Sequence, residues 1–153
     1  MTQPPFPLPF EENETIEFSS EGIEFELEDE QAATEWLKKI IEQAGNSLRL
    51  LNFIFCSDDY LLHLNVEYLN HDTLTDIITF PYAEPPIIEG DIFISIDRVR
   101  ENAQEFNVSF EQELHRVMAH GVLHLCGFGD KTPAEQATMR QKEDEALLLL
   151  NHL

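Results

Sequence analysis

Hydrophobic and polar positions follow two periods along this chain, and together they predict an α+β fold. Stretches in which apolar side chains alternate with polar ones, or in which apolar, β-branched and aromatic residues dominate, are typical of strands. Such stretches are residues 15–18, 23–27, 47–56, 77–81 and 90–96, of which the first two form one or two half-exposed strands. Segments with helical spacing separate and follow them. We therefore expect an α+β domain with a small, about four-stranded mixed sheet packed by helices.

Capping residues mark where the predicted helices begin. Helices are expected after Asp29, Ser57, Asp97, Ser109 and Thr132, and the first, second, fourth and fifth of them run to about residues 44, 68, 125 and 150. Gln112 and Glu135 stand three residues after the last two caps and complete capping boxes. Gly45 marks the end of the first helix, because glycine readily adopts the left-handed conformation found there.

The fourth predicted helix carries two histidines, and glycines follow it. His120 and His124 are four residues apart, so both imidazoles lie on one face of the helix. Gly127 suits the helix C-terminus, and Gly129 lets the chain fold back and bring Asp130 towards the histidines. Two histidines and one aspartate leave the fourth position of a tetrahedral ion open for water, as in catalytic zinc sites. The pattern predicts one divalent ion, first of all zinc, on this helix and the turn after it.

The residue after the first histidine weighs against a zinc peptidase. In the His-Glu-x-x-His motif of those enzymes a glutamate at this position is the general base, whereas this chain has Gly121. Glu111, Glu113 and Glu143 are near enough in sequence to replace that base. We expect the first two to lie on the solvated face of the helix. A metallopeptidase is therefore a less favoured alternative.

Composition and charge narrow the class of protein. The chain of 153 residues, 42% of them hydrophobic, is expected to form one domain over residues 1–153, with residues 1–12 as an extended proline-rich tail. Its two cysteines imply no disulfide framework, and no signal peptide or membrane span is visible, so a cytoplasmic protein is expected. The formal net charge of −21 repels polyanions and favours a basic partner, for instance a ribosomal protein.

Several motifs, in order, resemble those of one family. Residues 120–128 are similar to the signature H-G-x-L-H-L-x-G-Y-D-H of the YbeY family of bacterial rRNA maturation factors. Residues 64–65 and 75–81 resemble its L-N and T-D-V-L-S-F-P, and residues 90–95 its G-D-I-x-I-S strand. Met139 and Glu143 match a methionine and a glutamate of its last helix.

The resemblance implies a metal-dependent, single-strand-specific endoribonuclease that acts in rRNA maturation and ribosome quality control. The metal would be held by three signature residues, and a metal-activated water would attack a phosphodiester. The implied partners are single-stranded rRNA and ribosomal particles or basic ribosomal proteins, with no nucleotide cofactor. A non-catalytic ribosome-assembly binding protein with a structural metal is the alternative.

Two positions depart from the family pattern. Asp130 stands where the family has its third histidine. Leu69 stands where the family has an arginine after L-N-x-x-Y, a residue suited to binding a phosphate near the metal. Lys131 and Arg98 are weak candidates for the missing positive charge, and His71, in the loop before a predicted strand, is a weak candidate for a further site residue.

Overall fold

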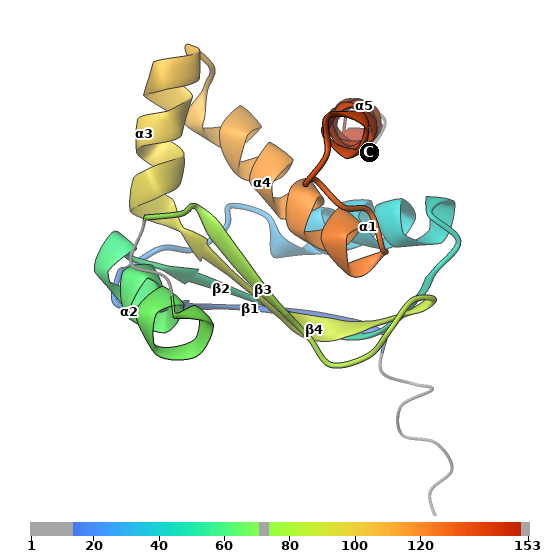
Figure 1. Cartoon of the computed structure of the whole chain (residues 1–153), viewed down its shortest axis with the longest axis horizontal. Helices are drawn as coiled ribbons and strands as arrows, with labels where there is room; N and C mark the ends of the chain where they lie inside the picture. The colour runs from blue at the N-terminus through green and yellow to red at the C-terminus, as the bar shows by residue number, and fades with distance from the viewer. Residues whose placement is uncertain (1–13, 71–73, 151–153) are drawn as a thin grey trace, which may run out of the picture.

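The structure is a computed structural model that describes residues 14–70 and 74–150, and a four-stranded sheet runs through it (Figure 1). Its strands are β1 (Thr15–Glu21), β2 (Ser47–Cys56), β3 (Ile77–Pro81) and β4 (Ile87–Ser95), in the order β1-β2-β4-β3. The first, second and fourth are parallel, and β3 pairs antiparallel with β4 at the edge. The predicted α+β fold with a mixed four-stranded sheet is confirmed.

Five helices in the described ranges pack around this sheet. They are α1 (Glu30–Gln43), α2 (Asp58–Leu69), α3 (Ile96–Phe106), α4 (Phe110–Leu125) and α5 (Pro133–Leu150). Figure 1 shows α1 and α4 against one face of the sheet, α5 beyond them, and α2 on the opposite face. Within the described residues, none of these helices combines the length and the apolar character that crossing a membrane requires.

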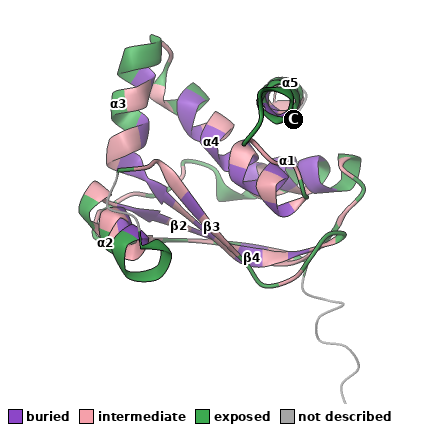
Figure 2. Ribbon diagram, viewed as in Figure 1, coloured by how far each residue is buried: buried purple, intermediate pink, exposed green. Residues whose placement is uncertain are grey.

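The main core lies between the sheet and the helices α1, α3, α4 and α5. Trp36, Phe53, Ile92 and Met118 are fully buried there, and in Figure 2 the buried positions of α1 and α4 face the strands. The indole Nε1 of Trp36 donates a hydrogen bond of 2.8 Å to the carbonyl oxygen of Ala146, so it also fixes α1 against α5. A smaller apolar cluster lies under α2.

Most of the predicted helix starts are confirmed by their hydrogen bonds. The side chains of Asp29, Ser57 and Ser109 accept from backbone N–H groups in the first turns of α1, α2 and α4. Thr132 and Glu135 form the reciprocal bonds of a capping box at the start of α5. Gly45 follows α1 with a φ of +79°, as expected for the residue that ends it.

Of the one or two strands expected near the N-terminus, one is present: residues 15–18 belong to β1, whereas residues 23–27 form no strand, although Ile23, Phe25 and Leu27 pack against the core. Alternation of apolar and polar residues indicates that one side of a segment is buried. A segment can be buried on one side without pairing with a neighbouring strand. Ser95 caps α3 in place of Asp97, because β4 begins at Ile87 and ends at Ser95, whose side chain accepts from the backbone N–H of Arg98. The proline-rich tail and His71 lie outside the described residues.

Gly121 marks the closest approach of α4 to the sheet. A Cβ atom at this position would lie 2.8 Å from Cδ1 of Ile77 on β3 and 3.1 Å from Cδ1 and Cγ2 of Ile92 on β4. The residue after His120 therefore faces packed side chains of the sheet. A glutamate at this position has no room to act as a base, which gives a structural reason for the absence of the peptidase motif.

We expect Gly121→Val to lower the free energy of unfolding by about 2–3 kcal/mol, because the added methyl groups overpack the contact between α4 and the sheet. Urea denaturation measures the change. Ala137→Val is the control, because it adds a β-branched side chain at an exposed position of α5 and should cost about 0.5 kcal/mol. Equal losses of unfolding free energy in the two variants would show that the close packing around Gly121 does not exclude a larger side chain.

Candidate metal centre

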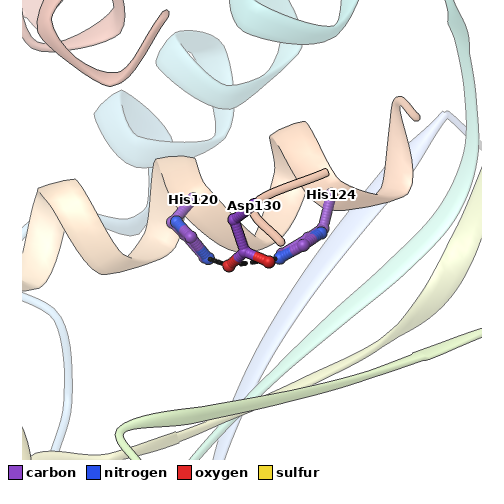
Figure 3. A group of neighbouring side chains, drawn as sticks. All are labelled: His120, His124 and Asp130. Carbon is purple, nitrogen blue, oxygen red and sulfur yellow. Dashed lines mark hydrogen bonds and ion pairs between the residues drawn. The ribbon is translucent and has the colours of Figure 1, made fainter. Parts of the chain in front are cut away.

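Three donor atoms converge where α4 ends and the chain turns back. His120 and His124 project from consecutive turns of α4, and Asp130 comes from the segment before α5 (Figure 3). Oδ2 of Asp130 lies 3.3 Å from Nε2 of His120 and 3.2 Å from Nε2 of His124. One ligand atom from each of the three residues lies within 4.8 Å of the other two. The structure thus brings together the three residues that the sequence spacing singled out.

The turn that carries Asp130 is fixed by the first turn of α5. Gly127, with a φ of +106°, turns the chain after the helix. The Glu135 carboxylate accepts from the backbone N–H groups of Lys131 at 2.9 Å and Thr132 at 3.3 Å. The side-chain amide of Gln136 donates to the carbonyl oxygen of Asp130 at 3.1 Å. These bonds hold the aspartate opposite the two imidazoles.

The donor set fits a divalent ion. Two imidazole nitrogens and one carboxylate oxygen are ligands that zinc takes in catalytic sites, and other first-row divalent ions accept the same set. All three side chains are partly exposed, so solvent can reach a fourth position. The arrangement can therefore hold an ion that stays open to a water or a substrate atom.

A buried ion pair stands behind His120. Nδ1 of His120 lies 2.7 Å from Oε2 of Glu143 on α5, and Arg116 donates to Oε1 of the same carboxylate at 2.9 Å and to Asp144 at 2.8 Å. A carboxylate at Nδ1 places the proton on that nitrogen and leaves the Nε2 lone pair for an ion. The resemblance to the family singled out Glu143. Residue spacing does not predict its contact with His120, which stands 23 residues away in the sequence.

The charges of this pair support each other. Burial opposes the ionisation of Glu143, but hydrogen bonds from His120 and Arg116 outweigh it and hold the pKa of the carboxyl below its usual value. Burial also opposes the protonation of His120, and the carboxylate of Glu143 outweighs this and raises the pKa of the imidazole. The site without an ion therefore favours a charged imidazole beside a charged carboxylate.

A pocket of about 290 Å³ opens beside His120 and Asp130. It is lined by Asp76, Ile77, Glu113, Arg116, Val117, His120, Asp130, Arg140 and Glu143. Burial raises the pKa of Asp76, and burial together with the charge of Asp76 raises the pKa of Glu113. Burial thus makes ionisation of both carboxyl groups less favourable than it is in water.

Glu113 contradicts the sequence prediction of a solvated position, whereas Glu111 is exposed as expected. Only 6% of the surface of Glu113 is exposed. The sequence does contain an indication of this position. Glu113 stands seven residues before His120, and two helical turns bring it to the same face of the helix. The sequence does not show that α5 packs on α4, where Arg140 and Glu143 of α5 line the same pocket as Glu113.

Of the other candidate site residues, Lys131 and Arg98 fall within the described ranges, and neither is part of the pocket lining. Lys131 is exposed, and the guanidinium of Arg98 contacts Asp58 at 2.8 Å and Glu101 at 3.3 Å. Leu69 is exposed at the C-terminal end of α2. Arg140, which the sequence analysis did not single out, does line the pocket.

The mixed sheet and the His, His, Asp group define an α+β protein with a potential site for one divalent ion. Residues 15–151 match the family model described as endoribonuclease YbeY. The chain belongs to this family, which confirms the resemblance seen in its motifs.

Relatives of nearly the same length support the assignment. A Flavobacterium johnsoniae protein named endoribonuclease YbeY is 53% identical over 136 residues, which are 89% of this chain and 97% of that protein. A Bacteroides thetaiotaomicron protein of the same name is 42% identical over 134 residues, 88% of this chain and 98% of that one. The solution structure of a Thermotoga maritima protein superposes with a TM-score of 0.60 at 30% identity, and the match covers 86% of this chain and 89% of that chain.

Proposed function

We propose that this chain is a zinc-dependent endoribonuclease that cleaves single-stranded RNA during the maturation of ribosomal RNA. Its membership of a family whose curated relatives are named endoribonucleases supports the activity. The observation that carries the proposal to particular residues is the convergence of His120, His124 and Asp130. The preference for zinc rests on two imidazole ligands among three.

Each residue of the proposed site would have its own role. Nε2 of His120, Nε2 of His124 and a carboxylate oxygen of Asp130 would hold the ion. When bound, a divalent ion at such a site lowers the pKa of water towards about 7 and polarises a phosphoryl oxygen. Glu143 orients His120 through Nδ1, and Arg116 keeps that carboxylate ionised and in place. The pocket beside them receives the RNA backbone.

The implied partners follow from the same proposal. Single-stranded rRNA within ribosomal particles is the substrate, and basic ribosomal proteins suit the acidic surface of a chain with a net charge of −21. The place of action would then be the cytoplasm, where ribosomes are assembled. A ribosome-assembly binding protein with a structural metal is the second candidate, favoured by this charge and by Leu69 at the position of the family arginine.

An assay with purified protein and single-stranded RNA tests the proposal. We expect zinc-loaded protein to cleave the RNA, and we expect a chelator to abolish cleavage and added zinc to restore it. An RNA duplex of the same sequence and casein are the controls, and neither should be cut. Cleavage that persists in chelator would remove the metal from the mechanism. A stable zinc-loaded protein that cuts no RNA would favour the binding protein.

A further inference from the structure

The pocket beside the candidate metal centre is short of positive charge for a phosphate. Besides the site residues Asp130 and Glu143, it is lined by Asp76 and Glu113. All nine lysines and arginines of the chain lie in the described ranges, and of these only Arg116 and Arg140 line the pocket. Besides the proposed ion, these two side chains are therefore the cations that an entering nucleic-acid backbone can meet in the pocket.

Arg116 is already occupied. Its side chain is only 17% exposed, and its two terminal nitrogens donate to Glu143 and Asp144 at 2.9 and 2.8 Å. Turning Nη1 towards a ligand would leave the buried Glu143 carboxylate without one of its partners, which is costly, and turning Nη2 would break the bond to Asp144. Arg116 therefore supports the site and does not bind the substrate.

Arg140 is in the opposite condition. Its side chain is 66% exposed, and among the described residues its one ion pair is a contact of 3.7 Å with Oε1 of Glu143. That oxygen already accepts a closer hydrogen bond from Arg116, at 2.9 Å. The remaining N–H groups of the Arg140 guanidinium form a fork that can take two phosphate oxygens together.

We propose that Arg140 is the phosphate-binding residue of this site and holds an RNA backbone phosphate in the pocket beside His120 and Asp130. This inference rests on the proposed ribonuclease function and names a residue that recognises its substrate. Leu69, at the position of the family arginine, is exposed at the end of α2 and is not part of the pocket lining, so Arg140 is the exposed cationic side chain that this pocket offers.

Kinetics with a short single-stranded RNA test the proposal. Arg140→Ala should lower kcat/KM about 10–100-fold with an unchanged zinc content, because a bidentate contact to the substrate is lost. Arg140→Lys should recover part of the loss, because it keeps the charge without the fork. Lys142→Ala is the matched control: it removes one charge from the same helix, and its ammonium lies 5.7 Å from the Phe128 ring centroid and outside the pocket. We expect this control to stay within about twofold of the unsubstituted protein.

A binding measurement separates this inference from the proposed function. A single-stranded RNA oligonucleotide is bound to zinc-loaded protein at several salt concentrations by rapid mixing, so that binding is recorded before the RNA is cut. Arg140→Ala should weaken binding and reduce the slope of log K against log salt by about 0.7, the value for one lost single-strand phosphate contact. If the protein cuts no RNA but Arg140→Ala weakens binding in this way, the nuclease proposal fails and the phosphate-binding role of Arg140 is supported. If the protein cuts RNA and Arg140→Ala behaves like Lys142→Ala in both measurements, the phosphate-binding role of Arg140 is refuted and the nuclease proposal is retained.

Discussion

Alanine at His120 or at His124 is expected to strip the protein of its ion and of its RNA cleavage. Each imidazole supplies one of the three converging donor atoms. Loss of an outer partner of a ligand typically costs about 10–100-fold in metal affinity, so loss of a ligand itself should cost more than about 100-fold. Dialysis followed by elemental analysis gives the metal content, and the single-stranded RNA assay gives the activity.

Two further variants make the result specific. Asp130→Ala should weaken the binding of the ion less, since both imidazoles remain on α4. Lys131→Ala is the control for metal content, because the substitution keeps the backbone N–H through which this exposed neighbour bonds Glu135. Full retention of the ion by both histidine variants would refute the assignment of this site. An unchanged affinity in Asp130→Ala would require a different third ligand.

Replacement of Glu143 should have the second largest effect. Glu143→Ala leaves Nδ1 of His120 without the carboxylate that orients it, so we expect zinc affinity to fall about 10–100-fold. It also removes a partner of the largely buried Arg116, so the free energy of unfolding should fall by about 2–3 kcal/mol. Zinc titration and urea denaturation measure the two changes.

Glu143→Gln separates charge from shape. The amide keeps the size of the side chain but not the charge that raises the pKa of His120, so this pKa should fall in the variant without metal, as measured by NMR titration. A raised folded-state pKa stabilises the protein below the unfolded value, and this contribution is lost as the pH rises through the folded one. The stability advantage of the unsubstituted protein over Glu143→Gln should therefore shrink at high pH. Asp144→Asn is the control, because Asp144 contacts Arg116 but not His120. A His120 pKa that is equal in all three proteins would show that Glu143 does not act on this imidazole.

Local chemistry made much of the fold predictable. Caps such as Ser57 and the pair Thr132 and Glu135 are read from neighbouring residues, and the hydrogen bonds they form stay within one turn. The error at Asp97 has the opposite cause. Its carboxylate accepts from the backbone N–H of Asp58 at 2.9 Å, so a residue on another helix uses the group that was assigned to a local cap.

The convergence of the three candidate ligands was predictable for the same local reason. His120 and His124 share one helix face, and Asp130 follows within the next turn of chain. The roles of Glu143 and Arg140 were not predictable, since spacing along one helix does not reveal which helix packs on it. The packing of α5 on α4 brings both side chains to the site.

The order of elements along the chain has a consequence for biosynthesis. All four strands of the sheet end by Ser95, whereas the three converging donors begin at His120 and Glu143 comes later still. A ribosome adds about 5–20 residues per second and releases the N-terminal segments first. A nascent chain therefore has every strand of its sheet before it has any ligand for the ion. It gains Arg140 and Glu143 only after the last of these donors, Asp130, so the proposed nuclease site cannot form before α5 has been synthesised.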